Sequence, residues 1–129
     1  MSYKYALPAL IITILIIYMS SIPDRSYLGV SSAMEQILSN LAHIPAFALL
    51  ALLWLKSLDL EGNRLLLDLF ILSGLILFAL STEFLQTFVP GRTASFMDFG
   101  LDLIGILSGF LIIRLLGRFA IFKKINQHP

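Results

Sequence analysis

Most of the side chains that could do chemistry stand in one stretch of the sequence, residues 81–102, between two strongly apolar segments. Glu83 and Gln86 are three residues apart, so in a helix they share one face. Asp98 and Asp102 follow at a spacing of four, which again places both carboxylates on one helix face. The sequence therefore predicts two helix ends that present acidic and amide groups to each other.

The connection between these two helix ends carries a cation. Pro90-Gly91 stops the first helix and reverses the chain, and Arg92 follows directly. A guanidinium binds a carboxylate or a phosphate through two parallel hydrogen bonds. Arg92 could therefore pair with Glu83 or Asp98 and only offset buried charge, or it could hold an anionic ligand. Both interpretations stay open at this point.

His43 stands near the start of another apolar segment, one turn before Phe47. A single histidine in an apolar helix is more often a packing residue than a base. With Glu83 and Asp98 nearby, however, His43 could exchange protons with a substrate, so these three are the candidate catalytic residues. The same groups could bind a divalent cation, but no HExxH motif, nucleophile elbow or P-loop is present. We therefore expect no metal and no cofactor.

Composition places the chain in a membrane. Hydrophobic residues make up 58% of its 129 residues and charged residues 13%, and the mean hydropathy is +0.91. These values lie far from the composition of soluble domains. The net charge of +1 and the lack of a nucleic-acid motif give no reason to expect a nucleic-acid partner. Cysteine is absent, which excludes disulfides and thiolate chemistry.

The apolar segments are long enough to cross a bilayer, which takes about 20 residues. We expect an all-α, polytopic four-helix bundle that forms a single domain over residues 1–129. The predicted spans cover about residues 5–22, 40–55, 65–88 and 96–116. Residues 21–40 should form a loop that carries a short interfacial helix, opened by a capping box that ends at Glu35. The second span is long enough only if Glu35 to Asn40 continue its helix or if the local bilayer thins.

Charge distribution predicts the orientation. Lys4 and four basic residues near the C-terminus place both termini in the cytoplasm, because cytoplasmic loops carry the excess of Lys and Arg. The first loop and the Pro90-Gly91 turn then lie outside. Gly105 and Gly109 continue the stripe of the two aspartates and would let another helix approach closely. The candidate ligand-binding residues of this outer polar layer are Arg92, Gln86, Ser95, Asp102 and Arg25.

The outer polar layer resembles a family signature. The string ExxQxxxPGRxxSxxD over residues 83–98 is similar to the motif of the VanZ-like family of bacterial membrane proteins, and Asn40-Leu41-Ala42-His43 is similar to the family's second motif. Two positions differ: members often have Asp-Lys where this chain has Ser39-Asn40, and usually Asn at Asp102. The resemblance implies an integral membrane protein of the kind named for low-level resistance to teicoplanin, whose lipid-anchored peptidoglycan target lies outside the membrane.

These observations lead to one main hypothesis and two alternatives. The main hypothesis is a protein of the bacterial cytoplasmic membrane whose outward-facing polar pocket binds or modifies an anionic lipid or a lipid-linked cell-envelope intermediate. Its partners would be membrane lipids and not nucleic acid. The alternatives are an accessory module that binds without turnover, and a bundle whose polar layer only fixes helix packing. A homo-oligomer also remains open.

Overall fold

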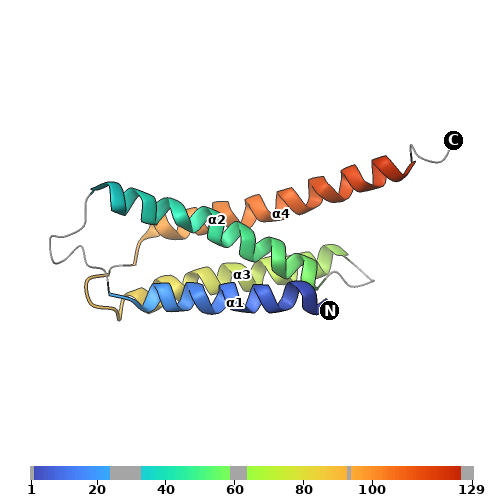
Figure 1. Cartoon of the computed structure of the whole chain (residues 1–129). Helices are drawn as coiled ribbons and strands as arrows, with labels where there is room; N and C mark the ends of the chain where they lie inside the picture. The colour runs from blue at the N-terminus through green and yellow to red at the C-terminus, as the bar shows by residue number, and fades with distance from the viewer. Residues whose placement is uncertain (1, 24–32, 59–63, 93, 126–129) are drawn as a thin grey trace.

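The computed structural model describes residues 2–23, 33–58, 64–92 and 94–125, and its regular elements in these ranges are four α-helices. They are α1 (Tyr3–Ser21), α2 (Ala33–Ser57), α3 (Arg64–Gln86) and α4 (Phe96–Ile125). Consecutive helices run antiparallel, so the ends of α1 and α3 meet the starts of α2 and α4 at one end of the bundle (Figure 1). The predicted all-α four-helix architecture is confirmed.

Most helix boundaries differ from the predicted spans by one or two residues, and the start of α2 and the end of α4 differ by more. α2 begins at Ala33, so Glu35 to Asn40 continue the helix and give the second span the length it needed. α3 ends at Gln86 and not at residue 88, because the amides of residues 87–89 bond to carbonyls three residues back in a tightened last turn. α4 continues past residue 116 to Ile125. The separate interfacial helix stays a prediction, since residues 24–32 lie outside the described ranges.

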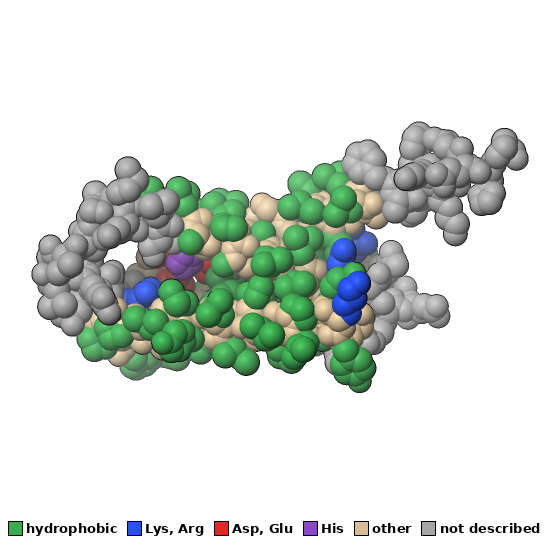
Figure 2. Space-filling model, viewed as in Figure 1, with side chains coloured by type: hydrophobic (Ala, Val, Ile, Leu, Met, Phe, Trp, Pro, Cys, Tyr) green, Lys and Arg blue, Asp and Glu red, His purple; other side chains and the backbone are tan. Residues whose placement is uncertain are grey.

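All four helices contain a stretch long and apolar enough to cross a membrane: Tyr3–Ser21, Asn40–Ser57, Leu65–Gln86 and Phe96–Gly117. Large apolar side chains such as Ile14, Phe70 and Leu111 point outward on different helices. Figure 2 shows this hydrophobic surface along the flank of the bundle. An apolar exterior of this extent is compatible with a lipid solvent, because hydrocarbon chains rather than water then surround it.

The closest helix pair is α2 with α4, and glycine makes it possible. A Cβ atom added at Gly105 would lie 2.6 Å from the carbonyl oxygen of Ile44, and one at Gly109 would collide with the backbone of Ala48. The predicted close approach at this small-residue pair is therefore seen. The contact also brings two candidate site residues together. Asp102 stands one turn before Gly105, and His43 directly precedes Ile44.

The two ends of the bundle carry different charges. At the end where α1 begins, the amide of Ser2 donates to the carbonyl of Ser57, and Lys4 and Lys56 lie 5.7 and 5.3 Å from the ring centre of Tyr5. In Figure 2 a cluster of basic side chains marks one end, while a histidine, acidic groups and a basic group gather in a hollow near the other. The candidate site therefore lies at the end opposite the lysines.

Candidate functional site

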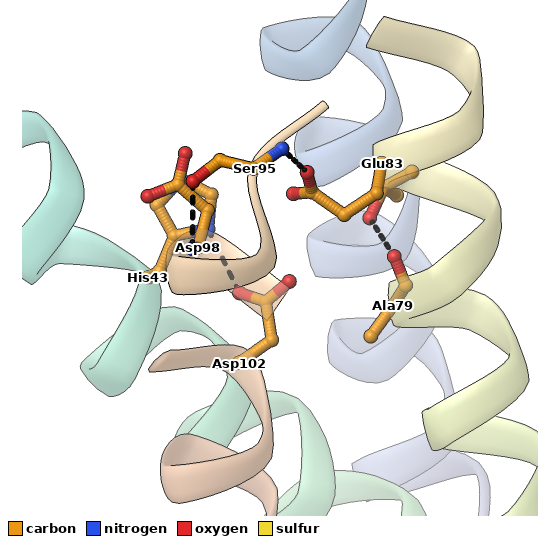
Figure 3. Close-up of polar contacts among 7 residues, drawn as sticks. His43, Ala79, Glu83, Ser95, Asp98 and Asp102 are labelled. Atoms are coloured by element: carbon orange, nitrogen blue, oxygen red, sulfur yellow. Dashed lines mark hydrogen bonds and ion pairs between the residues drawn. The ribbon is translucent and has the colours of Figure 1, made fainter. Parts of the chain in front are cut away.

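The centre of the site is a pair formed by His43 of α2 and Asp102 of α4. The imidazole Nδ1 lies 2.8 Å from Asp102 Oδ1, the Asp102 side chain is fully buried, and the His43 side chain is 22% exposed. A buried carboxylate that bonds one ring nitrogen fixes the orientation of the imidazole and leaves the other nitrogen for a partner. Within the described part of the chain, His43 Nε2 has no hydrogen-bond partner. Figure 3 shows the two side chains meeting between their helices.

A second contact joins α3 to the start of α4. The backbone N–H of Ser95 donates to Glu83 Oε2 at 2.8 Å, and the backbone N–H of Asp98 donates to Ser95 Oγ at 3.3 Å. The second bond confirms Ser95 as the N-cap of α4. Glu83 thus stabilises the turn that places Asp98 and Asp102 beside His43. In Figure 3 these carboxylates approach the histidine from α3 and α4.

Three carboxylates of the site have an oxygen without a partner. Glu83 Oε1, Asp98 Oδ1 and Asp102 Oδ2 are buried and accept no hydrogen bond from any described residue. Buried polar atoms are normally satisfied by a protein group, an ordered water or a proton on the group itself. A carboxyl oxygen of this kind can carry a proton of its own, so these side chains could store or pass a proton. Among the described residues, no three His, Asp or Glu side chains are arranged as metal ligands.

Arg92 bonds to α1 and not to a carboxylate of the site. Its Nε donates to the carbonyl of Ile22 at 2.9 Å, and its Nη2 donates to the carbonyl of Met19 at 3.3 Å. Carbonyls at the end of a helix lack intrahelical partners, so the guanidinium caps the end of α1. The sequence-based pairing of Arg92 with Glu83 or Asp98 is not among its contacts. No other hydrogen bond joins the Arg92 guanidinium to a described residue, and its other N–H groups could bond an anion.

A cavity of about 200 Å³ lies beside this cluster, between α1 and α2. Its polar side chains are His43, Gln86, Arg92 and Ser20, and the Gln86 side chain is buried without a hydrogen bond to any described residue. The apolar remainder of the lining consists of Leu15, Ile16, Met19, Ala42, Ala46 and Phe47. The cavity therefore combines a cation, an amide and an imidazole with an apolar wall.

The structure brings together most of the residues that the sequence singled out, in two layers. His43, Gln86 and Arg92 line the cavity, whereas Glu83, Ser95, Asp98 and Asp102 stand outside its lining and hold one another or His43. Arg25 lies outside the described residues. Sequence reasoning missed the part played by α1, whose contribution is mainly two backbone carbonyls and an apolar wall and therefore leaves no polar signal in the sequence.

Comparison with known proteins agrees with this picture. The family model described as VanZ/LLP1 matches residues 5–117, which include all four membrane-length stretches and every described residue of the site. No curated protein and no solved structure matches the chain. With four apolar helices and a family match over most of its length, the chain belongs to the VanZ/LLP1 family of membrane proteins.

Proposed function

We propose that the cavity between α1 and α2 binds the anionic head group of a lipid or of a lipid-linked cell-envelope intermediate. The observation that carries this proposal is the lining itself, in which the rest of the wall beside Arg92, His43, Gln86 and Ser20 is apolar. A phosphate or carboxylate would bond N–H groups of Arg92 that do not reach α1, together with the amide of Gln86. The apolar wall suits the first methylene groups of a lipid, whereas a soluble polar metabolite would leave that wall without a partner.

The charge pattern supports an outward-facing site in a bacterial cytoplasmic membrane. Lys4 and Lys56 lie at the end opposite the cavity, and cytoplasmic ends carry the excess of basic residues. Both chain termini would then be cytoplasmic, and the site would open at the outer leaflet, where lipid-linked peptidoglycan precursors are exposed. An effect on teicoplanin susceptibility would follow from binding or altering such a precursor.

In the catalytic form of the proposal, His43 is the acid–base group. Asp102 orients it, as a buried carboxylate does for a catalytic imidazole. Glu83 and Asp98 exchange protons with the pair through their unpartnered oxygens. The three residues first proposed as catalytic thus keep a part in the mechanism, although only His43 lines the cavity.

One observation favours the alternative, a polar layer that only fixes helix packing. Each polar contact of the site joins two chain segments: His43 to Asp102, Glu83 to Ser95, and Arg92 to the end of α1. A packing role accounts for these bonds. It does not account for the position of the Gln86 amide in the wall of the cavity.

Replacing Arg92 with glutamine tests the binding proposal. The amide of the new glutamine can still donate to the carbonyls of α1, but it lacks the charge that an anion requires. We expect affinity for phosphatidylglycerol to fall by about 10–100-fold, the loss of one charge-assisted hydrogen-bond pair. Native mass spectrometry of the detergent-extracted protein, titrated with phosphatidylglycerol, measures this as loss of the lipid adduct.

The matched control is Lys56→Gln, which removes one positive charge from the opposite end of the bundle. Lys56 is exposed and lies against Tyr5, away from the cavity. The control should keep the adduct at the wild-type level. Equal adducts in wild type, Arg92→Gln and Lys56→Gln would rule out Arg92 as the head-group ligand and leave the packing role as the better account.

A further inference from the structure

A second cavity, of about 230 Å³, opens among α1, α2 and α3. Only two of its lining side chains are polar, and these bond to each other, Trp54 Nε1 donating to Thr13 Oγ1 at 3.3 Å. Its other lining residues are Leu50, Leu58, Phe70, Ile71, Gly74, Leu75 and Phe78. The second cavity therefore offers a ligand almost nothing except contact with hydrocarbon.

The second cavity adjoins the first one. α1 and α2 form walls of both, and Ile16 of the first lies three residues from Thr13 of the second, on the same face of α1. Phe47 of the first and Phe78 of the second are in ring contact, with centroids 6.0 Å apart. The two cavities are thus consecutive hollows along one side of α2.

We propose that the second cavity holds a hydrocarbon chain of the same lipid whose head group binds at His43 and Arg92. This inference rests on the proposed function and adds the chain to it. Leu50 lies seven residues after His43 on α2, a rise of about 10 Å, and Trp54 lies about 16 Å from His43. A lipid chain is about as long as the hydrocarbon of one leaflet is deep, about 15 Å, so a chain that runs along α2 from His43 passes Leu50 and reaches the neighbourhood of Trp54.

The length of a lipid chain and the walls that the two cavities share favour a lipid chain over other apolar occupants. A neighbouring helix from a second copy would cover the outside of the groove, but it would have no reason to begin at the polar cavity. A chain joined to the head group must begin there. The site consequently selects its ligand twice, by charge at Arg92 and by chain length at the second cavity.

Gly74 gives this selection a sharp test. A Cβ atom added at Gly74 would meet nothing within 4 Å, and the residue lines the second cavity. Gly74→Leu should therefore fill the hollow without disturbing the bundle. A Cβ atom at Gly117 of α4 would also meet nothing within 4 Å, and Gly117 lines neither cavity. Gly117→Leu is the matched control.

Trp54 reports occupancy, since it is the chain's single tryptophan and lines the second cavity. We would reconstitute the protein in phosphatidylcholine vesicles and titrate with phosphatidylglycerol or phosphatidylcholine that carries brominated chains, which quench indole fluorescence. Brominated phosphatidylglycerol should quench the fluorescence of wild-type Trp54 at a mole fraction about tenfold lower than brominated phosphatidylcholine does. The difference is the expected contribution of one hydrogen-bonded contact to the anionic head group. Gly74→Leu should abolish this preference, because the new side chain takes the space of about two methylene groups of the lipid chain in the second cavity. Gly117→Leu should retain the preference.

The outcomes separate the two proposals. Suppose that Arg92→Gln loses the phosphatidylglycerol adduct, but that the two brominated lipids quench wild-type Trp54 fluorescence equally. The chain site is then wrong and the head-group site stands. An unchanged preference in Gly74→Leu overturns the chain site as well. A dimer that dissociates in Gly74→Leu would assign the groove to a second copy instead. If Arg92→Gln changes neither the adduct nor the quenching, the proposed function fails with it.

Discussion

Replacing His43 with leucine is expected to lower the free energy of unfolding by about 3–5 kcal/mol, the usual loss when a buried carboxylate is left without its partner. Asp102 is fully buried, and its second oxygen already lacks a described partner. Without His43, neither oxygen of that carboxylate would have a described donor. Equilibrium unfolding in mixed detergent micelles, followed by Trp54 fluorescence, measures the change.

The double variant His43→Leu with Asp102→Leu supplies the control. Replacing both partners by apolar side chains of similar volume is often neutral or stabilising, so most of the lost stability should return. The free energies of unfolding of the four proteins in this double-mutant cycle then give the interaction energy between His43 and Asp102. Additive losses, with the double variant the least stable of the four, would show that His43 and Asp102 do not act as a pair.

His43→Gln has the second large expected effect, on turnover. Glutamine keeps a polar side chain of similar length but cannot act as an acid or base near neutral pH. General acid–base catalysis contributes about 10²–10⁴-fold, so the rate of lipid modification should fall by that factor. Mass spectrometry of lipid extracts from cells that express wild type or variant at matched abundance measures the modified lipid.

Glu83→Gln extends this comparison to the carboxylates. The amide oxygen at position 83 can still accept the bond from the Ser95 N–H, so the start of α4 should be retained. Only proton exchange is lost, and turnover should fall again. If His43→Gln and Glu83→Gln both leave the lipid profile at the wild-type level while Arg92→Gln loses its lipid adduct, the protein binds without catalysis and the accessory role is the better account.

The helices were predictable because lipid imposes a strong pattern on sequence. Each span needs a long apolar run, and Pro90-Gly91 and the charged residues near position 60 interrupt those runs. Helix ends were less predictable. Nothing in the apolar pattern shows that α2 starts at Ala33, because the residues before Asn40 mix polar and apolar side chains and fit either a helix or a loop.

The candidate site was predictable in its members and less so in its contacts. The antiparallel arrangement of α3 and α4 necessarily brings Glu83 near the start of α4, and sequence reasoning found that. Which carboxylate meets His43 depends on how α2 packs on α4. Gly105 and Gly109 fix that packing, and a shift of one helical turn would bring a different carboxylate to His43. The contacts of Arg92 depend on backbone carbonyls at the end of α1, which every sequence possesses. Side-chain identity gives no information about such partners.

The most direct measurement of the central claim is the ¹⁵N nuclear magnetic resonance spectrum of histidine-labelled protein in lipid nanodiscs. The Nδ1 resonance of His43 should change in Asp102→Asn, since that carboxylate accepts its proton. The Nε2 resonance should move when phosphatidylglycerol replaces phosphatidylcholine, in wild type and not in Arg92→Gln. A His43 signal that responds to neither Asp102→Asn nor the anionic lipid would contradict both the pair and the head-group site.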